Sequence, residues 1–196
     1  YTSYHWISPA LVEFRKKYPG VDFKLEIEAT SDTLSYLLND KIDVGIFEDN
    51  KSNKAIYTPL FSDEFFVIVP ARHKWASHKY LHAGQLSHEP YIMYDIPLEK
   101  STISKLILKN ISPSKVYKFP LTEVIFEMVK AGFGFTIMPN WVGLNYLKAK
   151  ELKAIRISKN GIRRTWYAGV LKGKDIPPYV QSFIDMLVKQ KAAVNT

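Results

Sequence analysis

EVIFEMVKAGFGFTIMP, residues 123–139, is a helix-like run that turns directly into a second apolar run. The helix pattern ends at Gly132, where the glycine that follows a helix is expected. Gly134 then permits a tight reversal into residues 135–138, which have the length of a buried strand. A helix that leads straight into a buried strand is typical of an α/β protein. We therefore expect helix 122–131 to pack closely on strand 135–138.

Helical and strand patterns alternate along the rest of the chain. The expected helices lie at 4–18, after a cap at Ser31, at 101–110, from about 141 and at 178–189. The expected strands lie at 21–28, 42–47, 65–69, 91–94, 116–119, 153–157 and 165–170. This order favours right-handed crossovers and mainly parallel sheets. We predict an α/β protein with two Rossmann-like lobes, joined by the crossover strands 65–69 and 165–170.

The crossover strands also divide the chain into lobes. We expect lobe I to comprise residues 1–69 and 169–196, and lobe II to comprise residues 70–168. A doubly wound lobe normally begins with a strand, whereas this sequence begins with Tyr1-Thr2-Ser3, which is typical of a helix cap. We therefore expect a first strand, and whatever precedes it, to be absent from this chain.

The composition excludes several classes of protein. The sequence has no cysteine, which rules out disulfides, cysteine nucleophiles and thiolate metal sites. No apolar run approaches the roughly 18–20 residues of a membrane span, so we expect no membrane partner. The net charge of +8 lies in residues 146–196, which hold 11 Lys and Arg against 3 Asp and Glu. Because aromatic residues are not interleaved with these charges, a solvated basic face is favoured over a nucleic-acid site.

The sequence contains no recognisable motif for catalysis or metal binding. It contains no Gly-x-Ser-x-Gly elbow and no phosphate-binding loop, and Ile137 stands where a dinucleotide fingerprint needs its third glycine. His73, His78, His82 and His88 are spaced unlike any standard zinc site and are typical of a polar surface loop. We expect no enzyme activity, no cofactor and no metal.

Hydroxyl residues stand at three of the predicted helix starts: Thr2 and Ser3, Thr30 and Ser31, and Thr122. Each is typical of an ordinary helix cap. Together they indicate an anion-binding site, because a helix N-terminus offers unpaired N–H groups and partial positive charge to a carboxylate or phosphate. Three such starts in two lobes would converge on one anion-binding cleft.

Three segments resemble one family, the effector-binding domains of LysR-type transcriptional regulators. LTEVIFEMVKAGFGFTIMPNW (121–141) resembles their Gly-x-Gly helix and strand, and NDKIDVGI (39–46) resembles a strand nearer the start of these domains. PLFSDEFFVIVPARHKWA (59–76) resembles their crossover. The resemblance covers nearly the whole chain in the right order. Within the family, MPNW (138–141) and RRTWYAGV (163–170) most resemble the homocysteine-responsive regulators of methionine biosynthesis.

The resemblance implies a bilobal fold like type II periplasmic binding proteins, with a small-molecule effector between the lobes. It also implies an N-terminal winged helix-turn-helix that is absent from this chain, cytoplasmic location, and a homodimer or tetramer that contacts DNA only through the missing domain. The family's cleft positions carry over to twelve residues here: Thr2, Ser3, Tyr4, Thr30, Ser31, Asp32, Phe47, Glu48, Tyr94, Asp95, Thr122 and Glu123.

An amino acid or another small carboxylate fits this set of residues. Hydroxyls and helix N–H groups at Thr2, Ser3 or Thr122 would bind its carboxylate, and an acid would bind its ammonium group. The candidate acids are Asp32, Glu48, Asp95 and Glu123. A solute-binding protein of a transporter is the alternative, because it has the same fold and needs the same cleft. An upstream helix-turn-helix would identify the regulator, and an export leader the transporter component.

Overall fold

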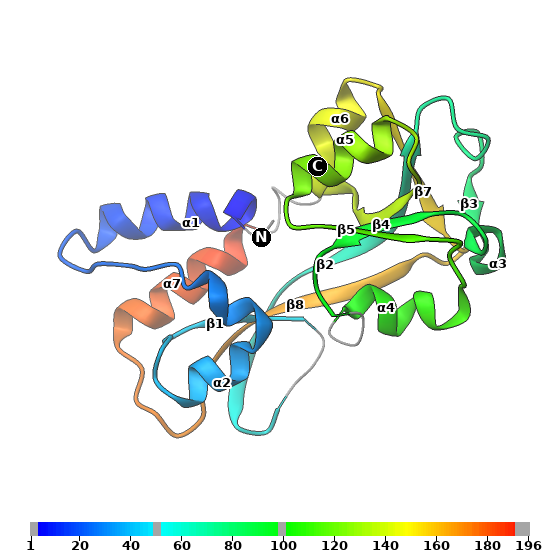
Figure 1. Ribbon diagram of the computed structural model, residues 1–196. Coiled ribbons are helices and arrows are strands. Elements are labelled where there is room, and N and C mark those ends of the chain that lie inside the picture. The colour runs from blue at the N-terminus through cyan, green and yellow to red at the C-terminus, as the bar shows by residue number, and fades with distance from the viewer. Residues whose placement is uncertain (1–3, 49–51, 98–100, 191–196) are drawn as a thin grey trace. The chain divides into compact units, whose positions relative to one another are not determined.

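The computed structural model describes residues 4–48, 52–97 and 101–190 of the chain (Figure 1). It forms two compact units, which we call unit 1 (Tyr1–Asp63 and Arg164–Thr196) and unit 2 (Glu64–Arg163). The chain passes from one unit to the other along two long strands, β2 (Ala55–Pro70) and β8 (Ile162–Leu171). The predicted lobe boundaries at 69 and 169 lie a few residues further along the same strands. The lobe boundaries at 69 and 169 stay a prediction.

Unit 1 combines helices with a short strand pair. Besides its parts of β2 and β8 it contains α1 (Tyr4–Lys17), η1 (Ile27–Ser31), α2 (Thr33–Leu38), β1 (Gly45–Phe47) and α7 (Pro178–Lys189). β1 runs antiparallel to β8, with Gly45 opposite Gly169. The ring of Phe47 explains both glycines, because a Cβ at Gly45 would lie 2.5 Å from it and one at Gly169 would lie 2.7 Å away.

Helices α1 and α7 pack on each other in unit 1. Phe14 of α1 meets Phe183 of α7 edge to face, with ring centroids 5.4 Å apart. α7 buries Val180, Ile184 and Leu187, a spacing of four and three residues that puts them on one face. The predicted helices 4–18 and 178–189 are thus confirmed, and their apolar stripes form this part of the core.

Unit 2 contains the remaining elements. These are β3 (Tyr80–Leu81), α3 (Ala83–Leu86), β4 (Tyr91–Tyr94), α4 (Thr102–Leu106), η3 (Leu108–Asn110), β5 (Val116–Phe119), α5 (Thr122–Lys130), β6 (Thr136–Pro139), η4 (Asn140–Gly143), α6 (Leu144–Lys148) and β7 (Leu152–Ile157). β2 lies between β6 and β7 and is antiparallel to both. β3 pairs parallel to β7, and β4 pairs parallel to β5. The α/β class is confirmed, but the sheets are mixed where mainly parallel sheets were predicted, because the crossover strands run against their neighbours.

The segment 123–139 folds as the sequence predicts. α5 buries Ile125, Phe126 and Val129, and every residue of β6 is buried. Gly132 follows the helix with φ 82°, and Gly134 has φ 155°. A Cβ on Gly134 would lie 2.3 Å from the carbonyl oxygen of Pro90, so only glycine fits there without displacing backbone.

Residues 21–28 do not form the predicted strand. Residues 21–26 are irregular and η1 begins at Ile27, while Phe23, Leu25 and Ile27 are 49%, 41% and 45% exposed. The alternation of apolar and polar residues is present, but a strand also needs a neighbour for its N–H and C=O groups. Among the described strands none pairs with this segment.

Two predicted caps are also wrong. Asp32, not Ser31, caps α2, and its carboxylate accepts a hydrogen bond of 3.2 Å from the backbone N–H of Ser35. At α5 the N-cap is Leu121, so Thr122 is the first helical residue. Its hydroxyl is engaged elsewhere, because it shares a hydrogen bond with Tyr94. A hydroxyl near a helix start therefore does not identify which residue has the extended backbone of a cap.

Candidate functional site

A buried cluster of charged residues marks the crossover strands in unit 1. Arg164 and Trp166 are two residues apart in β8, so both side chains lie on the same, buried side of the strand. Asp63 comes from β2, and Glu48 directly follows β1. Three separate segments of the chain therefore meet at one guanidinium. We call Glu48, Asp63, Arg164 and Trp166 the Arg164 cluster.

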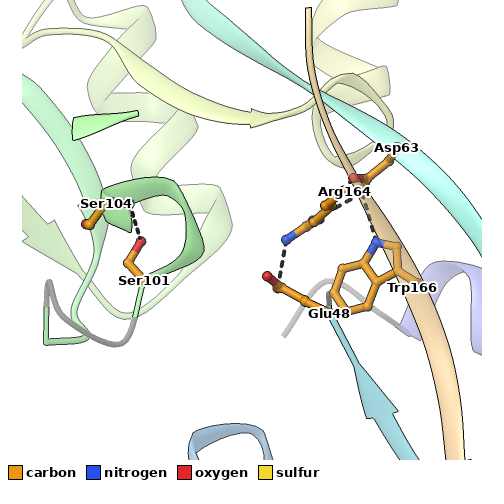
Figure 2. A network of polar contacts seen from close by, with 6 residues as sticks. All are labelled: Glu48, Asp63, Ser101, Ser104, Arg164 and Trp166. Atoms are coloured by element: carbon orange, nitrogen blue, oxygen red, sulfur yellow. Dashed lines mark hydrogen bonds and ion pairs between the residues drawn. The ribbon is translucent and has the colours of Figure 1, made fainter. Parts of the chain in front are cut away.

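The geometry of the Arg164 cluster is that of a charge-assisted network (Figure 2). Arg164 donates from Nε and Nη2 to the two carboxylate oxygens of Asp63, at 2.9 and 3.1 Å. It also donates from Nη1 to Glu48 Oε1 at 2.7 Å. The indole N–H of Trp166 donates to Asp63 at 3.0 Å, and the guanidinium lies 4.3 Å from the Trp166 ring centroid. Forked pairing and stacking on an aromatic ring are both arrangements that suit arginine better than lysine.

The charged side chains of this cluster are largely buried, so they must be paired. The side chain of Asp63 is 2% exposed, that of Arg164 is 9% exposed and that of Glu48 is 27% exposed. Buried charges persist only when they are paired, since desolvation costs several kcal/mol for each ion. Within the cluster one cation faces two carboxylates, which gives these four residues a formal charge of −1. Such a group can bind anions through arginine and cations through its acids.

Aromatic rings adjoin the cluster. Trp6, in the first turn of α1, meets Phe61 edge to face at 5.0 Å and lies 6.3 Å from Trp166, both measured between ring centroids. Trp6 is 1% exposed, and its indole N–H has no hydrogen-bond partner among the described residues. A buried donor without an acceptor costs about 1–3 kcal/mol. A ligand atom that accepted a hydrogen bond from the Trp6 N–H would therefore bind more favourably.

Unit 2 brings two other predicted site residues together. The hydroxyls of Tyr94, at the end of β4, and Thr122, at the start of α5, share a hydrogen bond of 2.6 Å. Burial raises the pKa of the Tyr94 hydroxyl; the bond with Thr122 opposes this shift, and the charge of Glu123 adds to it. Tyr94 therefore stays a neutral hydroxyl, which can donate or accept a hydrogen bond.

The other predicted site residues differ in their surroundings. Thr2, Ser3 and the side chains of Tyr4 and Ser31 lie outside what the structure describes. Four residues are exposed: Thr30, Asp32, Asp95 and Glu123. Phe47 is 8% exposed and packs edge to face on Tyr57, with centroids 5.2 Å apart. It is part of the core, and Glu48 is the predicted residue that reaches the Arg164 cluster.

Arg164 and Asp63 are the residues that the sequence interpretation missed. A signal exists, because each crossover strand carries a pair of like charges, Asp63 with Glu64 and Arg163 with Arg164. Such pairs in otherwise apolar strands suggest that one member of each faces inward and is paired. The Arg163 and Glu64 side chains do form their own contact, of 3.5 Å, in unit 2.

Other features of the described residues suggest no alternative site. No three His, Asp or Glu side chains there converge as metal ligands would, and His73 instead packs on the ring of Trp75. A cavity beside His73 and Phe135 has a volume of about 60 Å³. Ligand pockets are usually about 300–1,000 Å³, so this cavity is too small for an amino acid. Every described helix is too short or too polar to cross a bilayer.

Comparison with known proteins gives consistent results. The family model of the LysR substrate binding domain matches residues 1–192. The regulator MetR of Haemophilus influenzae is 25% identical over 193 residues, covering 97% of this chain and 62% of that protein. MetR of Escherichia coli is 24% identical over 182 residues, covering 91% of this chain and 57% of that protein. The chain thus spans about 60% of the length of these curated relatives.

Solved structures show the same architecture. The regulatory domain of MetR, a LysR family regulator from N. meningitidis, has a TM-score of 0.87 and 27% identity, covering 98% of this chain and 90% of that one. The CcmR regulatory domain of Synechocystis PCC6803, in complex with 2-PG, has a TM-score of 0.83 and 21% identity, with coverage of 97% and 93%. The type II periplasmic-binding-protein-like fold is thereby confirmed. This chain belongs to the LysR substrate-binding domain family.

Proposed function

We propose that this domain binds a small carboxylate, in particular an amino acid such as homocysteine, and transmits the binding to a DNA-binding domain elsewhere in the full-length regulator. The Arg164 cluster is the observation that carries this proposal. It places a buried guanidinium and an accessible carboxylate in one network, which are the two groups that a carboxylate and an ammonium group require. The MetR relatives agree with the sequence resemblance to homocysteine-responsive regulators, so homocysteine is the first ligand to test.

Regulation requires that the effector prefer one arrangement of the domain over another. Coupling of about 1–3 kcal/mol between two sites is typical of such proteins. A ligand that binds both arrangements equally tightly would regulate nothing. We therefore propose a sensor without enzyme activity that works in the cytoplasm, where its DNA would be. The relatives named above are regulators, so the transporter alternative has no support.

We further propose that the domain pairs with a second copy of itself. In unit 1, Val12 of α1 is 53% exposed, close in sequence to the exposed apolar residues Phe23, Leu25 and Ile27. In unit 2, Leu106 of α4, Val116 of β5 and Phe133 are 43%, 37% and 50% exposed. A contiguous patch of exposed apolar side chains is typical of a protein–protein contact, and we propose that these residues contribute to one.

Calorimetric titration of the purified domain tests the ligand proposal. The panel consists of homocysteine, methionine, other α-amino acids and small carboxylates without an amino group. Saturable binding of homocysteine alone supports the methionine-regulator subgroup. Saturation by another acid keeps the carboxylate proposal and discards the subgroup. If no carboxylate binds saturably at millimolar concentration, the proposal is wrong.

A further inference from the structure

The two carboxylates on Arg164 differ in how they hold it. Asp63 uses both oxygens, accepting from Nε and Nη2, and its side chain is 2% exposed. Glu48 accepts from Nη1, and its side chain is 27% exposed. Asp63 is therefore the fixed partner of the guanidinium, and Glu48 is the partner that solvent and solutes can reach.

The guanidinium is oriented by groups other than Glu48. Asp63 neutralises its charge with a forked pair of hydrogen bonds, a strongly directional arrangement. The ring of Trp166 lies against the guanidinium, and the Trp166 N–H in turn fixes Asp63. Glu48 thus adds a second negative charge to a pair that is already neutral. Among the contacts described above, the one with Nη1 is the contact whose loss would leave Arg164 held by Asp63 and Trp166.

A carboxylate ligand would make the same kind of contact that Glu48 makes. The carboxylate of an effector can accept from Nη1 at a similar distance, since both are charge-assisted N–H···O bonds. Exchange of one carboxylate for another leaves Arg164 paired throughout. It also releases the Glu48 carboxylate beside the ligand, where an ammonium group would compensate its charge.

We propose that Glu48 stands in for the effector's carboxylate on Arg164, and that the effector displaces it and then pairs its own ammonium group with the released Glu48. This inference rests on the proposed function and names the ligand class within it. The site selects zwitterionic α-amino acids, because a ligand with a carboxylate alone must displace Glu48 without compensating its charge. Glu48 is then the residue that determines specificity, and Arg164 is the residue that binds the anion.

The test uses Glu48→Gln, which keeps the size of the side chain and removes its charge. Glu13→Gln is the matched control, since Glu13 is an exposed acid of α1 in the same unit and the net charge changes equally. Calorimetry would measure the amino acid that binds most tightly in the panel and the same molecule without its amino group. For homocysteine that analogue is 4-mercaptobutyrate.

We expect wild type to prefer the amino acid over the analogue. Glu48→Gln should bind the analogue about tenfold more tightly than wild type, because the neutral amide at position 48 competes less well than a carboxylate for Nη1 of Arg164. The variant should also lose most of the preference for the amino acid, because it has no charge to pair with the ammonium group. If Glu48→Gln does not fold, Glu48→Asp replaces it. Its shorter side chain draws back from Nη1 yet keeps the charge, so both ligands should bind more tightly.

Two results would overturn the inference while the proposed function stands. Glu48→Gln could change both affinities no more than Glu13→Gln does, or it could weaken both ligands by the same factor. Either result would mean that Glu48 is only a structural tie between the end of β1 and strand β8. Absence of any carboxylate binding to wild type would overturn the proposed function itself, and this inference with it.

Discussion

Arg164 joins segments that are far apart in the sequence. Its partners Glu48 and Asp63 precede it by 116 and 101 residues. Patterns of apolar residues cannot reveal such a pair, because pairing of charges depends on which strands become neighbours. The sequence identified Glu48 through a family resemblance, whereas the signal for Arg164 among 27 basic residues is its place beside Arg163 in a crossover strand.

Asp63→Asn should destabilise the domain by about 2 kcal/mol, because Arg164 would lose its forked, charge-assisted pair with Asp63 in a buried place and keep its contact with Glu48. Urea unfolding followed by tryptophan fluorescence measures this change. Asp22→Asn is the matched control, since Asp22 is exposed in the irregular segment after α1. A loss for Asp63→Asn within about 0.5 kcal/mol of the control, the usual range of surface changes, would mean that the pairing matters little to stability.

Gly134→Ala should cost at least about 1–3 kcal/mol, because its Cβ would meet the carbonyl oxygen of Pro90 at 2.3 Å and the backbone must shift. Gly84→Ala, in α3 of the same unit, is the control, since nothing lies within 4 Å of a Cβ there. Thermal unfolding of both variants checks this. Equal stability of the two variants would contradict the close approach that we infer for the turn at 132–134.

At the scale of elements, the sequence predicted most helices and strands but not their partners. β4, β5 and α7 have the predicted bounds, because each is a short apolar or amphipathic run with clear turn residues on both sides. Residues 21–28 carry an equally clear alternation and yet form no described strand. Periodicity reports which side of a segment is apolar, whereas pairing depends on a neighbour elsewhere in the chain.

Helix caps show the same limit of prediction from sequence, at the level of single residues. α2 begins after Asp32, and we expect Asp32→Ala to destabilise the domain by about 1 kcal/mol, because the N–H of Ser35 would lose its acceptor. Thr30→Ala is the control, because Thr30 is exposed in η1. Chemical denaturation of both variants measures the difference. If Thr30→Ala costs as much as Asp32→Ala, the cap is not at Asp32.

At the scale of the whole molecule, we expect a dimer held partly by the exposed side chains of Phe23 and Leu25 in unit 1. Phe23→Ser combined with Leu25→Ser should weaken dimerisation at least tenfold, since each side chain removed from a well-packed contact typically costs about 1 kcal/mol or more. Sedimentation velocity over a range of concentrations measures this. Leu38→Ser, an exposed change in α2, is the control. An unchanged dimer in the double variant would place the contact elsewhere.

The central claim is that a small carboxylate binds at the Arg164 cluster, and the most direct test is to follow the indole N–H signals of the four tryptophans by NMR. During titration with the amino acid that binds most tightly, we predict a saturable shift of the Trp166 signal, since this N–H donates to Asp63 beside Arg164. The Trp75 signal, from the ring next to His73 in unit 2, should stay in place. A saturable shift of Trp75 with an unmoved Trp166 would contradict the account.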